Sequence, residues 1–273
     1  MRAAPRVGVV AALHQELAAV LARLPHERRQ QVGGRDFWLG DWHGHELVAV
    51  LARVGKVAAA TTATILIERF GVDRIIFTGT AGGLAPGVAV GDLVVARSFL
   101  QHDLDASPLF PRHEVPLYGQ SRFAADSAMT AALAAAARAV LAQRDVALGP
   151  QALQEFELGA ARVHEGLLLS GDRFIATAQA SQALRAELPD ALAVEMEGAA
   201  VAQVCHDYGL PFAAVRTISD RADDSAHVDF MRFVQRVASR YSVAVLAHYF
   251  RAMPAREAMM RGCAAPATPG CSG

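Results

Sequence analysis

Cysteine is scarce in this sequence, with only Cys205, Cys263 and Cys271 among 273 residues. An odd and widely spaced set of three does not form the disulfide framework of a small secreted domain. The three also lack the Cys-x-x-Cys spacing of thiol or metal chemistry. Cys205 lies on an apolar face at helical spacing, which predicts a core residue.

Long apolar runs and an excess of one charge are also missing. No run reaches the roughly 18 residues that span a bilayer, and no signal-peptide cleavage site follows Val7–Leu13. The 26 basic and 27 acidic side chains balance, which argues against nucleic acid or an anionic membrane as a partner. We therefore expect a cytoplasmic protein. The 53% hydrophobic content excludes disorder for most of the length.

Short apolar runs alternate with helical patterns along most of the chain. Most runs lack polar alternation, which is typical of strands buried on both faces of a mostly parallel sheet. We predict strands at Val7–Leu13, Glu46–Ala52, Arg74–Thr78, Asp92–Ala96, Val163–Ser170, Ala191–Glu195 and Phe212–Ser219, and helices at 14–24, 56–70, 124–144, 178–188, 197–208 and 228–250.

This alternation predicts an α/β fold in one domain, residues 1–251, built as a three-layer sandwich. Helices flank a central, twisted sheet that is mixed but mostly parallel. Segment 101–123, rich in Pro, His and aromatic residues, is expected to be a long excursion with a functional or interface role. Residues 252–273 lack an ordered pattern and are predicted to form a disordered tail.

Four predicted strands deliver polar or glycine-rich sequence at their ends. The first is followed by Glu16, the third by residues 78–83 (TGTAGG), and the sixth by Glu195-Met196-Glu197. The last contains Arg216 and is followed by Asp220. Because ligands bind beyond the carboxyl ends of strands in open parallel sheets, we expect one site here. A buried guanidinium at Arg216 needs an acidic partner or a bound anion.

Each feature also has a simpler interpretation. Glu16 could be an ordinary solvated residue, Glu197 a favourable first-turn carboxylate and Asp220 a cap or turn former. The glycines of 78–83 could serve a plain turn, since the run matches neither the dinucleotide fingerprint nor the P-loop. His102-Asp103-x-Asp105 has metal-ligating residue types but no second cluster, so no metal site is predicted. His43-x-His45 is expected in a polar turn, facing water.

Six segments, in this order, resemble the nucleoside phosphorylase and hydrolase superfamily, and most closely its 5′-methylthioadenosine/S-adenosylhomocysteine nucleosidases. They are VGVVAALHQEL (7–17), VGKVAAATTATIL (54–66), TGTAGGLAPGVAVGDLVVA (78–96), SGDRFI (170–175), VEMEGAAVAQVC (194–205) and VRTISDRADDSAHVDF (215–230). The resemblance covers about residues 6–250. It implies a nucleoside phosphorylase-like fold, a hydrolase that releases adenine from both thioether nucleosides, no cofactor, and a homodimer with segment 101–123 at or near its interface.

The resemblance also implies roles for particular residues. Asp220 would give a proton or hydrogen bond to the purine N7, Glu197 would bind the ribose hydroxyls, and Glu16 would activate the attacking water. Arg216 would contact that water. The other implied substrate-binding residues are Thr80, Ala81, Gly82, Glu195, Met196 and Ser219 around these acids, Phe174 and Ile175 at adenine, Leu13, Val54 and Phe230 at the 5′-alkylthio group, and Ala106 and Leu109 from the excursion.

The chemistry explains these residue types. Cleavage passes through an oxocarbenium-like state, so the leaving base must be neutralised while water attacks. Asp220 then needs a raised pKa, whereas Glu16 must be ionised, which Arg216 would favour. A phosphorylase would need an anion site where Glu16 stands, and a carboxylate repels phosphate. Hydrolysis is favoured. A hydrolase of another adenine nucleoside such as 6-amino-6-deoxyfutalosine, a phosphorylase and a catalytically silent nucleoside-binding module stay open.

The sequence departs from the nucleosidase pattern at several positions. Thr80 stands where these enzymes usually carry Ser, and Leu13 takes the place of Met. The excursion adds Arg112 and His113, whose polarity has no place in the pattern. The substrate's 5′ end is therefore the least determined part of the prediction.

Overall fold

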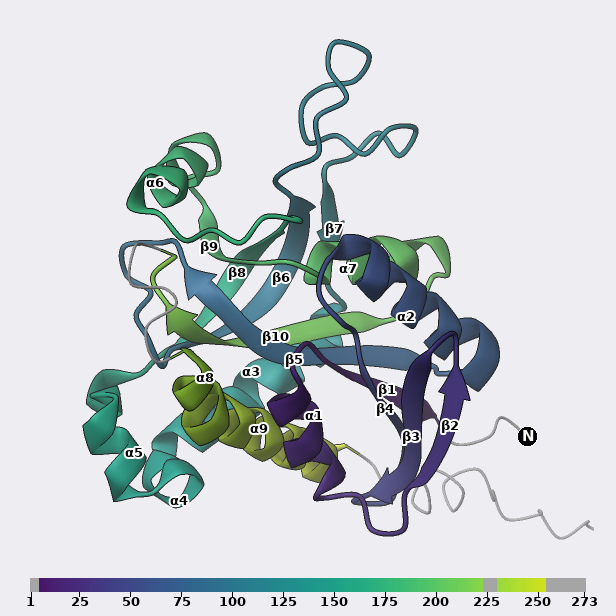
Figure 1. Ribbon diagram of the computed structural model, residues 1–273, viewed down its shortest axis with the longest axis vertical. Helices are drawn as coiled ribbons and strands as arrows, with labels where there is room; N and C mark the ends of the chain where they lie inside the picture. Colours follow the sequence, from purple (N-terminus) through teal and green to yellow (C-terminus); the bar gives the residue numbers. More distant parts are fainter. Residues whose placement is uncertain (1–4, 223–229, 254–273) are drawn as a thin grey trace, which may run out of the picture.

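A ten-stranded sheet lies between two groups of helices in the computed structural model, which describes residues 5–222 and 230–253 (Figure 1). The strands are β1 Arg6–Ala11, β2 Arg28–Val32, β3 Arg35–Trp42, β4 His45–Leu51, β5 Arg74–Gly83, β6 Leu93–Gln101, β7 Arg122–Ala124, β8 Val163–Ser170, β9 Ala191–Glu195 and β10 Phe212–Asp220. The helices are α1 His14–Leu21, α2 Lys56–Phe70, α3 Ser127–Ala142, α4 Arg144–Leu148, α5 Pro150–Glu155, α6 Ala178–Glu187, α7 Gly198–Asp207, α8 Phe230–Phe233 and α9 Ser239–Ala252. A π turn, Val234–Ala238, joins α8 to α9. In these two ranges no helix is both long and apolar enough to cross a bilayer.

The sheet runs in the order β10-β6-β8-β9-β5-β1-β4-β3-β2. Strand β10 also pairs with β5, so β5, β10, β6, β8 and β9 form a closed ring, while β7 pairs with β6 outside it. Five of the ten pairings among the described strands are parallel, including β1 with β5 and β5 with β10. The predicted α/β sandwich around a mixed sheet is confirmed.

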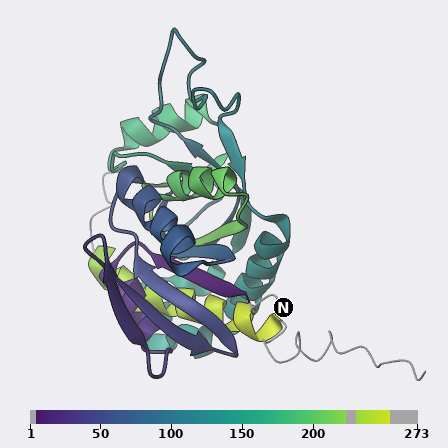
Figure 2. The same ribbon diagram turned by 90° about the vertical axis from the view of Figure 1, so that its right-hand side faces the viewer.

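Two apolar cores lie on the two faces of the sheet. Successive side chains of a strand point to opposite faces, so Val9 of β1 packs with α1, α3 and α9, while Val10 packs with α2 and α7. Figure 2 shows α2 and α7 side by side over the sheet. A third, smaller apolar cluster joins Leu167 and Leu169 of β8 with Leu184 of α6.

All seven predicted strands are present, but β5 is longer than expected. The strand was predicted to end at Thr78 before the glycine-rich run, and this is wrong because β5 continues through that run to Gly83. Both neighbours supply backbone partners there: Thr80 pairs with Thr217 of β10, and Gly83 pairs with Ala193 of β9. The predictions also missed β2, β3, β7, α4 and α5. Helix 228–250 was predicted to begin at residues that lie outside the described ranges.

Between β6 and β7 the chain forms the predicted excursion, which projects beyond the sheet (Figure 1). Leu109 and Leu117 are 84% and 92% exposed there. Arg112 and His113 both contact Glu187 of α6, at 2.7 Å from Arg112 Nε and 2.9 Å from His113 Nε2 to Oε1. Arg112 and His113, which the nucleosidase pattern did not explain, therefore attach the excursion to α6.

The remaining predictions have mixed outcomes. Cys205 is buried as predicted, and burial raises the pKa of its thiol to about 12. His43 is exposed in a turn, but His45 begins β4 and is buried, with Nε2 3.1 Å from the Phe250 carbonyl oxygen. The expectation that His45 faces water is wrong because α9 covers this end of the hairpin. The predicted tail was to begin at residue 252, but Ala252 still belongs to α9. The rest of the predicted tail, from Pro254 onward, lies outside the described residues.

Candidate active site

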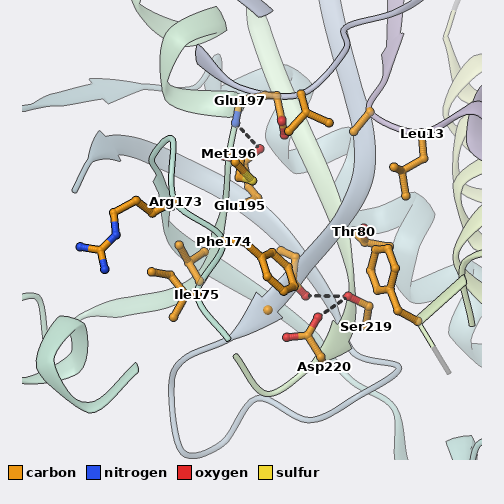
Figure 3. Close-up of a pocket in the computed structure, with 16 residues that line it drawn as sticks. Leu13, Thr80, Arg173, Phe174, Ile175, Glu195, Met196, Glu197, Ser219 and Asp220 are labelled. Atoms are coloured by element: carbon orange, nitrogen blue, oxygen red, sulfur yellow. Dashed lines mark hydrogen bonds between the residues drawn. The ribbon is translucent and has the colours of Figure 1, made fainter. Parts of the chain in front are cut away.

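A cavity of about 400 Å³ lies where β1, β5, β9 and β10 end (Figure 3). Its volume is within the range of about 300–1,000 Å³ that is usual for small-molecule sites. It is lined by Ala12, Leu13, Val54, Thr80, Ala81, Gly82, Arg173, Phe174, Ile175, Val194, Glu195, Met196, Glu197, Ser219, Asp220 and Phe230. Strands distant in sequence thus bring most of the predicted site residues to one hollow.

Glu16 lies in the first turn of α1, next to the cavity wall. Its side chain is fully buried, which excludes the interpretation as a solvated residue. Oε2 accepts a hydrogen bond from the Leu13 amide at 3.0 Å, whereas Oε1 has no hydrogen-bond partner among the described residues. Burial raises the pKa of Glu16 to about 7, and the Arg216 charge lowers it by less. Arg216 thus lowers the pKa of Glu16 as expected, but the opposite effect of burial is larger.

Arg216 is completely buried in β10, and its acidic partner is Glu195. Nη2 lies 2.7 Å from Glu195 Oε2, and Nη1 donates to the Phe77 carbonyl oxygen at 3.1 Å. The guanidinium carbon lies 4.0 Å from the centre of the Phe77 ring, a cation–π contact. Nε has no hydrogen-bond partner within the described part of the chain. The requirement for a partner, expected from the sequence, is met by a carboxylate.

Glu195 holds the start of α7 as well as Arg216. Its two oxygens each accept a hydrogen bond from the Gly198 amide at 2.9 Å, and Ser170 Oγ donates to Oε1. The Ser170 hydroxyl in turn accepts from the Ala199 amide at 2.7 Å. A carboxylate at a helix N-terminus is stabilised by the free amides and the helix dipole. These contacts fix the Glu195 carboxyl between the N-terminus of α7 and Arg216.

Glu197 lines the cavity and is 5% exposed. Burial, and then repulsion from Glu195, raise its pKa to about 8, although the Gly55 amide donates to Oε1 at 2.9 Å. It occupies the N-cap position of α7 without a side-chain capping hydrogen bond, so capping does not explain it. The raised pKa favours the protonated form of this carboxyl, which can both donate and accept hydrogen bonds.

Asp220 ends β10 on the cavity wall. Ser219 Oγ donates to Oδ2 at 2.7 Å, and the Ala222 amide donates to Oδ1 at 2.8 Å (Figure 3 shows the first contact). The second is the local turn contact that the simpler interpretation expected. A Cβ on Gly82 would lie only 2.8 Å from Asp220 Oδ1 and 2.9 Å from the Ala222 Cβ. Only glycine fits beside this carboxyl.

The apolar part of the cavity is open at its mouth. Phe174 is 56% exposed and Val54 60% exposed, whereas Ile175 is buried. The Arg173 side chain points away from the other labelled residues in Figure 3. Ala106 and Leu109, the predicted pocket residues of the excursion, do not line this cavity in their own chain. Glu16 and Arg216 also do not line the cavity, whereas the other predicted site residues do.

Some contributors were missed by sequence reasoning. Ala12, Arg173 and Val194 also line the cavity, and Ser170 holds Glu195. Ser170 ends a predicted strand, so the strand-end argument that found Glu16 and Asp220 was sufficient to find it. The metal candidates do not share a centre, because Asp103 pairs with Lys56 while Asp105 accepts from Ser107 Oγ at 2.6 Å.

Comparisons with known proteins agree with this geometry. The family model described as the phosphorylase superfamily matches residues 6–251. The chain belongs to the phosphorylase superfamily. The expected superfamily and its fold are thereby confirmed, as is an enzyme of the N-ribosyl hydrolase branch, because the curated relatives carry nucleosidase names.

Three members of the superfamily illustrate the similarity. The 5′-methylthioadenosine/S-adenosylhomocysteine nucleosidase of Shewanella putrefaciens is 33% identical over 241 residues, 88% of this chain and 96% of that protein. The corresponding nucleosidase from Neisseria meningitidis, in complex with methylthio-immucillin-A, gives a TM-score of 0.79 at 31% identity, covering 91% and 99% of the two chains. A futalosine hydrolase of Helicobacter pylori gives 0.75 at 29% identity, covering 90% and 97%.

Proposed function

We propose that this chain hydrolyses the N-ribosidic bond of 5′-methylthioadenosine and S-adenosylhomocysteine and releases adenine. The observation that carries the proposal is that Glu197 and Asp220 line one cavity, while Glu16 binds the amide of Leu13, which also lines it. The nucleosidase names of relatives at 33% identity support this substrate class. The reaction needs no metal or cofactor, because each proton transfer has a carboxyl group to perform it.

The bond breaks by proton transfer at one end and water attack at the other. Asp220 gives its proton to the purine N7, and the electron pair of the C1′–N9 bond leaves with adenine. Water bonds to C1′ and loses a proton to Glu16, from which solvent returns the proton to Asp220. Each acid–base contribution is worth about 10²–10⁴ in rate.

Two unpaired buried atoms support the role of Glu16. Glu16 Oε1 and Arg216 Nε are buried without a hydrogen-bond partner among the described residues, and each such atom calls for a polar partner. The positive charge of Arg216 lowers the pKa of Glu16, so the two groups interact electrostatically. An attacking water that donates to Glu16 and accepts from Arg216 satisfies both. A base with a pKa of about 7 suits proton abstraction at neutral pH.

Glu197 supports the ribose assignment in a different way. Its carboxyl lines the cavity, and its protonated form offers a donor and an acceptor to a hydroxyl pair. Because the Gly55 amide already binds Oε1, the carboxyl has a fixed orientation. We assign adenine to Phe174 and Ile175, opposite Asp220, and the 5′ group to Leu13, Val54 and Phe230.

Hydrolysis is favoured over phosphorolysis by the charges near the cavity. Buried Arg216 is committed to Glu195, and Arg173 points away in Figure 3. The group next to the wall at the end of β1 is the carboxyl of Glu16. A phosphate dianion placed there would be repelled by the Glu16 carboxyl, and the Arg216 charge is already paired with Glu195.

The excursion suggests how the 5′ end is covered. Leu109 is exposed and remote from its own cavity, so we propose that it and Ala106 cover the cavity of a second copy in a homodimer. This contact would bury apolar surface that a lone chain leaves in water. The cytoplasmic location stays a prediction.

Purified protein should be offered each thioether nucleoside and 6-amino-6-deoxyfutalosine, with and without phosphate, and adenine release measured. We expect turnover of both thioethers that does not depend on phosphate. The H. pylori futalosine hydrolase with 29% identity makes the third substrate the second candidate. Turnover of that substrate alone would favour it, ribose 1-phosphate formation would establish a phosphorylase, and binding without cleavage would leave a nucleoside-binding module.

A further inference from the structure

Three charged side chains close a ring of contacts at the start of α2. Lys56 Nζ lies 2.5 Å from Asp103 Oδ1, and Asp103 Oδ2 accepts a hydrogen bond from the Asp172 amide at 2.7 Å. Asp172 Oδ1 accepts in turn from the Lys56 amide at 2.8 Å. We call Lys56, Asp103 and Asp172 the clasp. None of the three lines the cavity.

The clasp joins three segments that are separate in sequence. Asp103 lies at the start of the excursion, Lys56 begins α2, and Asp172 follows β8 two residues before Phe174. Gly55, the neighbour of Lys56, donates its amide to Glu197 Oε1 at 2.9 Å. The clasp therefore connects directly to both the segment assigned to adenine and the acid assigned to ribose.

The fit around Gly55 shows how closely these parts pack. Gly55 has φ +95°, and a Cβ there would lie 3.0 Å from Asp172 Oδ1. The amides of Gly55 and Lys56, consecutive in the chain, thus bind the carboxyls of Glu197 and Asp172 at the N-terminus of α2. A shift of Asp172 would displace the Gly55 amide and, with it, the Glu197 carboxyl.

Helix stability alone does not explain Lys56. A cation in the first turn of a helix opposes the helix dipole, at a cost of about 0.3–1 kcal/mol. Its side chain and that of Asp103 are only 16% and 19% exposed, so the ion pair is shielded more than an ordinary surface pair. Although burial opposes ionisation of Asp103, the Lys56 ammonium and the Asp172 amide lower its pKa.

We propose that Lys56, Asp103 and Asp172 are positioning residues, which hold the Phe174-Ile175 segment and the Gly55 amide where substrate requires them. The inference rests on the proposed function for its substrate. In addition, Asp103, at the start of the excursion, would help to position the site of its own chain. This role does not depend on whether Leu109 covers the cavity of a partner. The clasp acts through binding residues, so its loss affects substrate binding more than the chemical step.

The test compares Lys56→Met and Asp103→Ala with wild type. We expect KM for methylthioadenosine and Kd for adenine to rise about tenfold, with kcat within threefold. Lys56→Arg should restore both constants because it keeps the cation. Arg138→Met, which breaks an ion pair of the same 2.5 Å length to Glu165, is the matched control and should change neither constant.

Amide hydrogen exchange gives a readout that does not need turnover. Removing the Asp103 carboxyl should speed exchange at Asp172 and its neighbours through Ile175, while α9 exchanges as in wild type. Exchange, KM and Kd all unchanged in folded variants would overturn the proposal, as would a fall in thermal midpoint without a change in KM or Kd. Absence of turnover in wild type would instead contradict the proposed function, and faster exchange in Asp103→Ala would still support the clasp.

Discussion

At the scale of single residues, Glu16 is a buried carboxyl, and its Oε1 has no hydrogen-bond partner in the part of the chain that the structure describes. Glu16→Gln keeps its shape and an oxygen for the Leu13 amide but removes the base. We expect adenine release to fall by about 10²–10⁴, with Kd for the nucleoside within a few-fold of wild type. Steady-state turnover and calorimetric binding check this. Unchanged turnover would contradict the role of Glu16.

Asp220 makes a different prediction because it faces the leaving base. Asp220→Asn keeps an oxygen for the Ala222 amide, so the fold should survive. The amide has no transferable proton, and we expect kcat to fall by about 10²–10⁴ with little change in thermal midpoint. Measuring kcat and KM separately decides the matter: a loss confined to KM would indicate that Asp220 only binds substrate.

At the scale of elements, the position of Asp220 in β10 depends on Gly82, which lies beside it in the neighbouring strand β5. In Gly82→Ala, the new Cβ would meet Asp220 Oδ1 at 2.8 Å, so the carboxyl must move or β5 must separate from β10. We expect kcat to fall at least about tenfold, together with a loss of about 1–3 kcal/mol in the free energy of unfolding. Gly87→Ala is the control, since a Cβ at Gly87 meets nothing within 4 Å. Equal activity of the two variants would show that Asp220 does not need this fit.

The elements also show what the sequence could predict. The run Ala191–Glu195 agrees with β9 at both ends, because a strand buried on both faces must be apolar over most of its length. The run Val163–Ser170 also agrees with β8 at both ends, although only its second half is buried. Strand β2, with the sequence RRQQV, was missed because it lies at the sheet edge with four exposed side chains. Its partner β3 supplies the pairing, which no local pattern of β2 reveals.

The main acids of the site could be predicted from the positions of strand ends, but the contacts between side chains could not. Glu16, Glu197 and Asp220 follow buried strands, and the edge of a sheet gathers whatever follows its strands. The clasp was not predictable in this way, because Lys56, Asp103 and Asp172 are ordinary polar residues until tertiary contacts join them. Likewise, the partner of Arg216 is Glu195, a choice that depends on the β5–β9 and β5–β10 pairings.

At the scale of the whole molecule, buried acids make stability depend on pH. The folded protein keeps the Glu16 proton up to a pKa of about 7, whereas the unfolded chain loses it near 4.5. Unfolding therefore releases a proton between these values, and stability falls as pH rises through this window. Glu197, with a pKa of about 8, acts in the same direction.

The shift at Glu16 corresponds to about 3 kcal/mol at most, which Glu16→Gln should recover at pH 8 but not at pH 4.5. Thermal midpoints of both proteins between these pH values check this. The variant should melt about 5–10 °C higher than wild type at pH 8, with the difference vanishing toward pH 4.5. A constant difference across the range would show that Glu16 is not protonated in the folded state.

At this scale the proposed homodimer can be tested by complementation between two inactive variants, which a monomeric enzyme would not show. If Leu109 covers the partner's cavity, Leu109→Asp and Glu16→Gln damage different chains of each site. A heterodimer of the two variants then contains one intact site, with Glu16 from one chain and Leu109 from the other. Random pairing makes half of the dimers mixed, so co-expression of two nearly inactive variants should restore about a quarter of wild-type activity. Light scattering checks the dimer itself, and activity no greater than the mean of the two variants would contradict a shared site.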